Sequence, residues 1–425
     1  MRRGLRRSDA VQIRPDTASS KWPGDMEHGS DHRPRLRPVE AFPIADGEHR
    51  AFAVRDTGGI SDVILSLSPP ALLVLSLLDG TNTLDDVRRI FAESYGQALA
   101  DETLRSMIRH LDEAWFLEGP SLEARYKSLT EEYRRKGVRP MPNAASLGIQ
   151  SDGAVFREIL GDRKDASDGP AVLGIIAPHL DYPRGAPCYA EAYGAILDRR
   201  VPDRVVILGT NHFGRGASVV ATGCAFETPL GMTRADREFL DLVESRAGDL
   251  RSAEWDHVRE HSVELQVAWL QHVFGADAFT IVPFLCSDPC GSRERDRDNR
   301  RELEAFAIAL SETARQIGGD TLLVAGADMS HVGAAFGDDR PLNTEFLGEV
   351  ERLDREALAR LEAGDSRGFV DTLAERENET RICSAGCMFV LASALREAKP
   401  ILRRYHQAVD VESGTCVTCA AMTYL

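Results

Sequence analysis

Four apolar segments in the second half of the chain share one pattern, in which a hydrophobic run ends at a polar or metal-binding residue. The segments cover residues 172–179, 205–212, 279–286 and 322–331. Continuous apolar runs bounded by glycine and proline are typical of strands that are buried on both faces. The pattern therefore predicts an α/β domain over residues 169–425, in which a sheet is flanked by helices.

The first part of the chain follows a different pattern. Residues 1–38 are rich in Arg, Asp, Ser and Pro and lack aliphatic periodicity, which predicts a disordered basic tail. Thr83, with Asp86 three residues later, can form a capping box at a helix start. Two strands and three helices are expected between residues 39 and 120, over 51–54, 63–67, 71–78, 84–95 and 101–114. This order predicts a small winged-helix domain. Residues 121–168, which are charged and helix-prone up to Lys136 and polar after it, are interpreted as a helical and polar linker.

Charge limits what these domains can bind. The chain has 67 acidic residues against 51 Lys and Arg, a formal net charge of −16, whereas affinity for a phosphate backbone needs dense positive charge. The last helix of the predicted winged-helix domain is also acidic, with Asp101, Glu102, Asp112 and Glu113. We therefore expect no nucleic-acid partner. No run reaches the ~18 apolar residues that span a bilayer, and no apolar signal segment follows the basic start, so a cytoplasmic protein without a membrane partner is expected.

The cysteines are confined to the second half of the chain, at positions 188, 224, 286, 290, 383, 387, 416 and 419. In a cytoplasmic protein such thiols are more often reduced or bound to metal than paired in disulfides. Cys224, Cys286 and Cys290 are interpreted as small buried hydrophobic residues. Cys416 and Cys419 have the spacing of a redox motif, but they lie in a predicted final strand, where alternate side chains point in different directions.

Three histidines follow three of the apolar runs: His179, His212 and His331. Ligands of α/β folds bind beyond the carboxyl ends of the strands, so we expect these histidines to share a site. Imidazole is a common ligand of iron, copper and zinc, and two histidines leave room for a third protein ligand and an open position. Either Cys383 or Cys387 could complete such a site, because a thiolate is a strong ligand.

Five short segments, taken in order, resemble the Memo-like family, whose bacterial and archaeal members are called AmmeMemoRadiSam system protein B. They are Ala177-Pro178-His179-Leu180-Asp181-Tyr182, Gly209-Thr210-Asn211-His212, Glu260-His261-Ser262-Val263-Glu264, Asp328-Met329-Ser330-His331 and Ile382-Cys383. That family is similar in fold to the class III extradiol dioxygenases, which use non-haem iron. The resemblance covers about residues 170–425.

The resemblance implies a role for each matching residue. His179, His212 and Cys383 would bind the metal, and His331 with Asp328 would occupy the acid/base position. The residues expected to line or support the pocket are Asp181, Tyr182, Asn211, Glu260 and His261. Non-haem iron is the expected cofactor, and copper is the alternative because a thiolate favours softer metals. The chain departs from the family pattern at Leu180-Asp181, which adds a carboxylate, and at Cys383-Ser384-Ala385, which removes a positive charge.

Residues 39–120 resemble the PqqD-like domains, through Ser68-Pro69-Pro70 and Leu78-Asp79-Gly80 at the ends of the first predicted helix. Those domains are similar to modules that bind a peptide along a sheet edge, so a peptide partner is implied. An interaction or dimerisation module without a peptide is the alternative. The family name in turn implies AMMECR-like and radical-SAM partner proteins.

Three functions are therefore compatible with the sequence. The first is a metal-dependent redox enzyme similar to the dioxygenases, and the second is a non-catalytic metal-binding adaptor that recruits a peptide or a radical-SAM partner. The third is a zinc metallopeptidase, because His257-Val258-Arg259-Glu260-His261 matches H-x-x-E-H, in which both histidines would bind zinc from one helix face. A nucleotide cofactor is not expected, since no glycine-rich phosphate loop is present.

Overall fold

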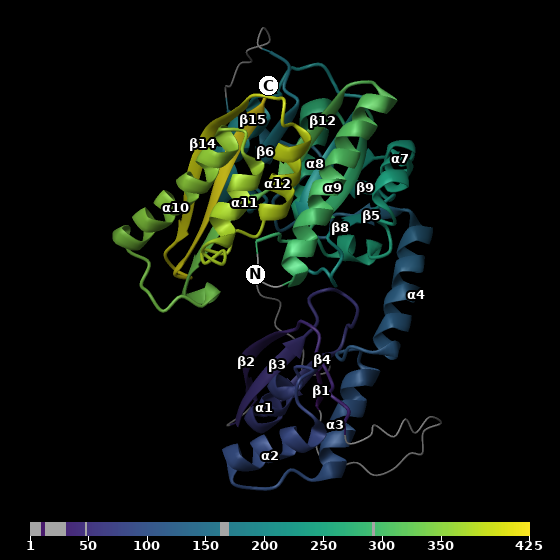
Figure 1. Cartoon of the computed structure of the whole chain (residues 1–425), viewed down its shortest axis with the longest axis vertical. Helices are drawn as coiled ribbons and strands as arrows, with labels where there is room; N and C mark the ends of the chain where they lie inside the picture. The colour runs from purple at the N-terminus through teal and green to yellow at the C-terminus, as the bar shows by residue number, and fades with distance from the viewer. Residues whose placement is uncertain (1–9, 13–30, 47–48, 162–169, 291–293) are drawn as a thin grey trace. The chain divides into compact units, whose positions relative to one another are not determined.

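The computed structural model describes residues 10–12, 31–46, 49–161, 170–290 and 294–425 (Figure 1). The chain divides into two compact units, Met1–Glu132 (unit 1) and Tyr133–Leu425 (unit 2). The helix α4 (Pro120–Lys136) continues from one unit into the other.

Unit 1 combines a small sheet with helices. Its strands are β1 (Ala10–Gln12), β2 (Glu40–Asp46), β3 (His49–Arg55) and β4 (Ile64–Leu67), in the spatial order β1-β4-β3-β2. Its helices before α4 are α1 (Pro69–Leu77), α2 (Leu84–Tyr95) and α3 (Asp101–Glu113). The two predicted strands form β3 and β4, which pair antiparallel, and the three predicted helices and the Thr83–Asp86 capping box are also confirmed.

Two features of unit 1 differ from the sequence prediction. Strand β2 was not expected, because Pro43 and the charged ends of this segment weaken its strand signal. Residues 31–38, assigned to a disordered tail, are in part packed into the unit, where the buried guanidinium of Arg37 pairs with Asp56 at 2.5 Å. The rest of that predicted tail lies outside the described residues, apart from β1, which pairs in parallel with β4.

Unit 2 is built around an eight-stranded mixed sheet with the order β13-β15-β6-β12-β7-β11-β8, in which β14 pairs with β15. The strands are β6 (Gly174–Ala177), β7 (Arg204–Thr210), β8 (Val219–Ala221), β11 (Thr280–Cys286), β12 (Thr321–Gly326), β13 (Asp328–Gly333), β14 (Pro400–Asp410) and β15 (Thr415–Tyr424). The four predicted apolar runs form β6, β12, β7 and β11, which pair in parallel. The predicted α/β fold is therefore confirmed, as is the final strand.

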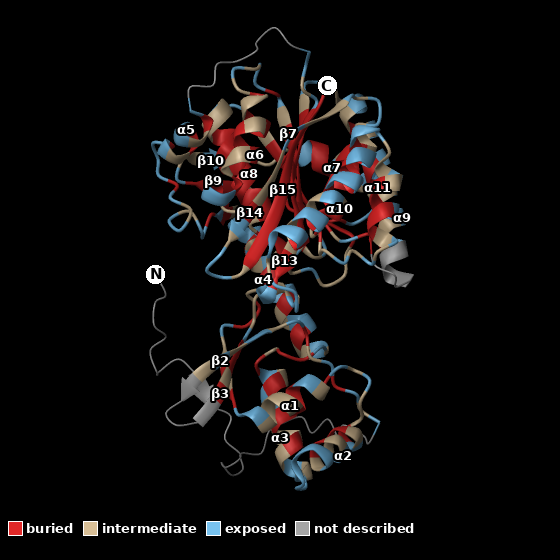
Figure 2. Cartoon of the chain, turned by 90° about the vertical axis from the view of Figure 1, so that its left-hand side faces the viewer, coloured by how far each residue is buried: buried red, intermediate tan, exposed pale blue. Residues whose placement is uncertain are grey.

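Helices cover both faces of this sheet. They are α5 (Ala154–Leu160), α6 (Tyr182–Gly194), α7 (Arg237–Ala247), α8 (Ser262–Phe274), α9 (Glu294–Ile317), α10 (Thr344–Glu362), α11 (Ser366–Ala374) and α12 (Ala385–Ala394). Short 3-10 helices lie at η1 (Glu254–Val258) and η2 (Ala334–Phe336). In Figure 2 the strands form the buried centre of unit 2, and the helices carry exposed residues on their outer faces.

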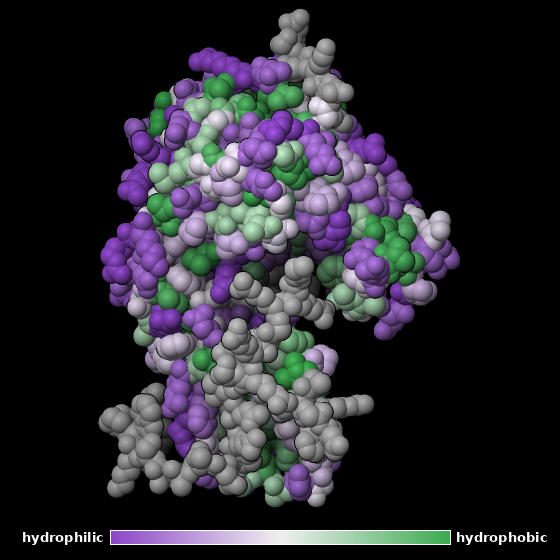
Figure 3. Space-filling view, turned by 180° about the vertical axis from the view of Figure 1, so that it is seen from behind, coloured by the Kyte–Doolittle hydropathy of each residue, from purple (hydrophilic) through white to green (hydrophobic). Residues whose placement is uncertain are grey.

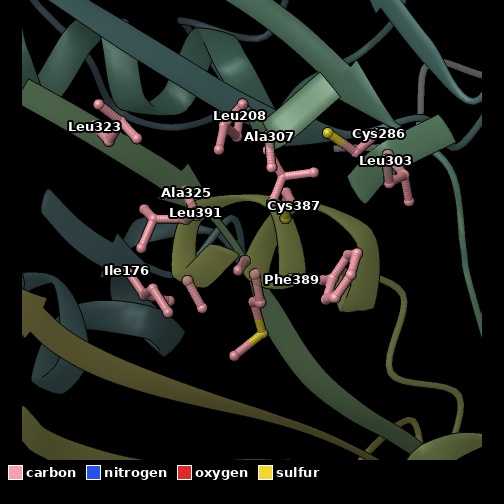
Figure 4. Close-up of a cluster of buried hydrophobic side chains, with 14 of the residues drawn as sticks. Ile176, Leu208, Cys286, Leu303, Ala307, Leu323, Ala325, Cys387, Phe389 and Leu391 are labelled. Carbon is pink, nitrogen blue, oxygen red and sulfur yellow. The ribbon is translucent and has the colours of Figure 1, made fainter. Parts of the chain in front are cut away.

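Alternate residues of the parallel strands face opposite helical layers, as the pleat of a strand requires. Leu208 and Leu323 pack with α7, α9, α11 and α12 on one face, and Figure 4 shows part of this cluster, including Phe389 and Leu391 of α12. Ile207 and Leu322 pack with α5, α6 and α8 on the other face. Both faces are apolar, which explains why the strands have no polar alternation in the sequence.

Part of the segment interpreted as a linker belongs to unit 2. Strand β5 (Val138–Pro140) pairs in parallel with β9 (Ala225–Thr228), which pairs with β10 (Gly231–Thr233) to form a separate three-stranded sheet. Met141, Ile149, Phe156 and Leu160 also pack into the core of unit 2, so the linker interpretation is wrong for the described residues from 133 to 161. The reason is that β5 is too short to have a periodic sequence signal and takes its partner from a distant part of the chain.

On the face shown in Figure 3, apolar side chains are interspersed with polar ones. In the described part of the chain, no helix combines the length and the apolar character needed to cross a membrane.

Candidate metal centre

Three side chains from different elements converge at the carboxyl edge of the parallel strands. His179 lies two residues after β6, His212 lies two residues after β7, and Cys383 lies two residues before α12. Because β6, β12 and β7 are parallel neighbours, their carboxyl ends meet at one edge of the sheet. One potential ligand atom from each of the three residues lies within 4.8 Å of the other two.

Two glycines allow a helix to approach this edge closely. A Cβ atom on Gly209, in β7, would collide with Ser262 Oγ, and one on Gly326, in β12, would collide with the Ser262 carbonyl oxygen. The start of α8 therefore rests directly on the ends of these two strands. This contact brings Glu260 and His261, which immediately precede α8, next to His212.

The hydrogen bonds of the two histidines fix their ring orientations. His179 Nδ1 donates to the Gly326 carbonyl oxygen at 2.9 Å, which leaves Nε2 facing Cys383 Sγ at 3.5 Å. His212 Nδ1 lies 3.0 Å from Glu260 Oε2. In both rings, Nδ1 is held by an oxygen and Nε2 remains to bind a metal, an arrangement typical of metal-binding histidines.

The buried side chain of Glu260 holds the backbone at His212, His261 and Ser262 as well as the imidazole ring of His212. Its carboxylate accepts hydrogen bonds from the backbone N–H groups of His212 (3.1 Å), His261 (2.8 Å) and Ser262 (2.9 Å). Burial opposes ionisation of this carboxyl, but the charge of His212 and these donors hold its pKa far below its usual value. The centroids of the imidazole rings of His179, His212 and His261 lie 5.1–5.2 Å apart.

The Cys383 thiol is set up to ionise. Burial alone would raise its pKa, but the charges and hydrogen bonds of His179 and His212 lower it to about 6. Burial raises the pKa of Cys387, one helical turn further on, to about 12, and its Sγ donates to the Ser384 carbonyl oxygen. Only Cys383 of these two thiols has the environment of a metal-binding thiolate.

Asp328 and His331 lie on β13, beside the three candidate ligands. Asp328 Oδ1 accepts from the backbone N–H groups of His179 and Leu180, and its Oδ2 lies 3.5 Å from His179 Nε2. Burial raises the pKa of Asp328 to about 6. Burial lowers the pKa of His331, whose Nδ1 donates to the carbonyl oxygens of Met329 and Arg381.

Three other residues predicted for the pocket serve different purposes in the fold. Asp181 caps α6 by accepting from the Arg184 N–H group, and its carboxylate pairs with the Arg184 guanidinium at 2.6 Å. Tyr182 is fully buried, and its hydroxyl donates to the Leu265 carbonyl oxygen. Asn211 Nδ2 donates to Asp256. Of the five predicted pocket residues, Glu260 and His261 are the two whose side chains contact the candidate ligands His179 and His212.

The H-x-x-E-H segment does not form a single helix. His257 belongs to η1 and His261 precedes α8. The two rings therefore do not lie on one helix face, which the zinc-peptidase hypothesis requires. His257 is fully buried, and its Nε2 donates to the Val220 carbonyl oxygen. Two groups of three potential ligands occur in the described part of the chain, and His257 belongs to neither of them.

Some residues that support the site were missed from the sequence. Ser384 Oγ accepts from the Asp328 N–H group at 3.0 Å and lies 3.3 Å from Cys383 Sγ. Its position next to Cys383 was the available signal. Asp354, on α10, accepts hydrogen bonds from Ser330 (2.6 Å), Thr418 (2.5 Å) and Tyr405 (2.9 Å), and nothing local in the sequence marks it.

Comparison with known proteins matches this part of the chain to one family. A family model described as "Memo-like protein" covers residues 157–423. A MEMO1 family protein of Methanopyrus kandleri is 30% identical over 263 residues, which are 60% of this chain and 84% of that protein. The MEMO1 family proteins of Aquifex aeolicus and Thermus thermophilus are 25% and 27% identical. Each alignment covers 80% of this chain, and it covers 88% of the Aquifex protein and 98% of the Thermus protein. Both alignments therefore extend into unit 1.

Proposed function

Because the chain belongs to the Memo-like protein family, we propose that His179, His212 and Cys383 bind one transition-metal ion and that the protein is a redox enzyme. The observation that carries the proposal is the convergence of these three ligand atoms within 4.8 Å. Iron is the first candidate for the metal and copper the second. We further propose that the reaction is similar to that of the dioxygenases and that the substrate is a small molecule or a peptide.

The donor set fits such an ion. Two imidazole nitrogens suit iron, copper and zinc, and the thiolate adds a soft ligand that favours copper(I) and shifts the redox potential. Glu260 and the Gly326 carbonyl oxygen hold the Nδ1 atoms, as the second shell of a metal site does. Three protein ligands leave at least one coordination position for a substrate or water.

The protein's own groups near the ligands can hold and move a proton. Asp328, with a pKa of about 6, is close enough to its ionisation midpoint to exchange a proton near neutral pH. Burial lowers the pKa of His331, so its ring is neutral and can accept a proton at Nε2. A bound iron or copper ion would supply Lewis acidity and electron transfer to a substrate, next to these two proton-carrying groups.

Metal analysis of the purified chain tests the proposal. We expect the wild-type protein, purified anaerobically, to carry close to one iron or copper ion per chain. His179→Ala and Cys383→Ala should lower this content at least tenfold. His406→Ala, which removes a histidine of β14 outside the candidate site, is the matched control and should keep the metal. Equal metal content in all four proteins would contradict the proposal.

A further inference from the structure

A buried arginine contacts the backbone next to the candidate metal centre. Arg139 is in β5, three residues after the end of α4, in a segment that the sequence predicted to be a linker. Its side chain is 2% exposed, and it lies outside the residues that match the family model. A buried guanidinium has five N–H donors to satisfy, so its contacts show what it holds in place.

Arg139 binds the junction between η1 and α8. Its Nε donates to the His257 carbonyl oxygen at 2.7 Å, and its Nη2 donates to the Glu260 carbonyl oxygen. The helix η1 ends at Val258 and α8 begins at Ser262, so these carbonyl groups have no helical N–H partner. The guanidinium satisfies them at one point and thereby fixes the shape of the junction.

The guanidinium is itself held on several sides. Its Nη1 pairs with Glu264, a fully buried carboxylate that also accepts from Asn143 Nδ2 at 3.1 Å. The Arg139 Cζ atom lies 5.1 Å from the centre of the Phe226 ring, on the neighbouring strand β9. A lysine could replace the charge in this position but not the planar array of donors.

Glu260 connects this support to the candidate ligand. Arg139 holds the main-chain carbonyl of Glu260, while the side chain of the same residue holds His212 Nδ1 and the His212 N–H group. Any shift of the η1–α8 junction therefore moves the carboxylate that orients the His212 ring. Changes to the groups that orient metal ligands typically lower metal affinity about 10–100-fold.

We propose that Arg139 is a positioning residue, which acts through Glu260 to set the orientation of His212. Its effect on metal affinity rests on the proposed function, whereas its effect on the Glu260 contacts does not. The segment that leaves α4 is thus part of the support of the site.

The test uses the full-length chain and separates positioning from stability. In Arg139→Met/Glu264→Leu both buried charges are replaced by apolar side chains, an exchange that often preserves stability. In the second variant, Arg139→Lys, the charge facing Glu264 is kept and the donors to the carbonyl groups are lost. The matched control is Arg134→Met, because Arg134, near the end of α4, pairs with Glu254 of η1 at 2.5 Å and makes no hydrogen bond to Glu260.

Two readouts are measured on each variant: amide hydrogen exchange of the metal-free protein and cobalt(II) binding. We expect exchange at His212, His261 and Ser262 to accelerate at least tenfold in both Arg139 variants. Cobalt affinity should fall 10–100-fold, with a changed thiolate-to-cobalt absorption band. Arg134→Met should leave both readouts at the wild-type level.

The two proposals fail in different ways. Unchanged exchange at these three amides in both Arg139 variants would overturn the positioning role, whatever the cobalt data show. Equal loss of cobalt affinity in Arg134→Met would also overturn it, because the effect would then come from general loosening of the segment. Accelerated exchange in a chain that binds no cobalt would support the positioning role and contradict the proposed metal site.

Discussion

The ionisation of Cys383 gives the sharpest prediction about the metal-free site. Burial opposes the thiolate, but His179 and His212 lower the pKa to about 6 from an ordinary value of 9.0. At pH 7 about nine-tenths of the Cys383 side chains should then be thiolate, compared with about one in a hundred for an unperturbed thiol. His179→Gln removes the first of the two stabilising groups, so we expect the pKa to rise by at least one unit.

The assay is alkylation by iodoacetamide after removal of metal with a chelator. The rate is followed from pH 4.5 to 9.5 by peptide mass spectrometry that separates Cys383 from Cys387. The midpoint of the pH profile is the readout, because a thiolate of low pKa is also a weaker nucleophile and the absolute rate mixes both effects. We expect a midpoint near pH 6 in the wild type.

Cys387 is an internal control, since burial raises its pKa to about 12 and it should stay unmodified over this range. A wild-type midpoint near pH 9, or a profile that His179→Gln leaves unchanged, would refute the electrostatic reasoning.

Three further predictions concern other parts of the molecule. Burial raises the pKa of Asp354 to about 6, so the stability that its protonated form contributes is complete below pH 3.8 and is lost as the pH rises through 6. Between pH 5 and 8, the unfolding free energy of the wild type, measured by urea denaturation, should fall by about 1.4 kcal/mol relative to that of Asp354→Asn. Parallel pH curves for the two proteins would contradict this. Thr83→Ala removes the capping box of α2 and should destabilise it by about 1 kcal/mol, seen as about fivefold faster amide exchange at Asp86. His257→Gln should leave metal content unchanged, whereas a loss equal to that of His179→Ala would revive the zinc-peptidase interpretation.

The parallel core of unit 2 could be predicted because its signal is local. Each of the four strands is an uninterrupted apolar run, and two of them end two residues before a candidate histidine. Cys383 was different, since the residues alone left Cys383 and Cys387 as alternatives and the family resemblance favoured Cys383. The structure distinguishes the two thiols by their surroundings, because the Sγ atom of Cys383 contacts His179 Nε2 and Ser384 Oγ.

The supporting residues could not be predicted in this way. Arg139 is a single charged residue in a polar stretch, and its partners lie 118–125 residues away in the sequence. Asp354 is one of several acidic residues on an amphipathic helix, and its hydroxyl partners come from β13, β14 and β15. Tyr182 was expected at the pocket because it adjoins the first ligand motif, yet it packs into an aromatic core. These roles depend on tertiary contacts that no local pattern records.

X-ray absorption spectroscopy at the edge of the bound metal identifies the atoms that ligate it. In the wild type, we expect a ligand shell with two imidazole rings and one sulfur atom. The sulfur contribution should be absent in Cys383→Ser and unchanged in Cys387→Ser. A wild-type shell of nitrogen and oxygen atoms alone, or a sulfur contribution that survives in Cys383→Ser, would contradict the assignment of His179, His212 and Cys383 as the metal ligands.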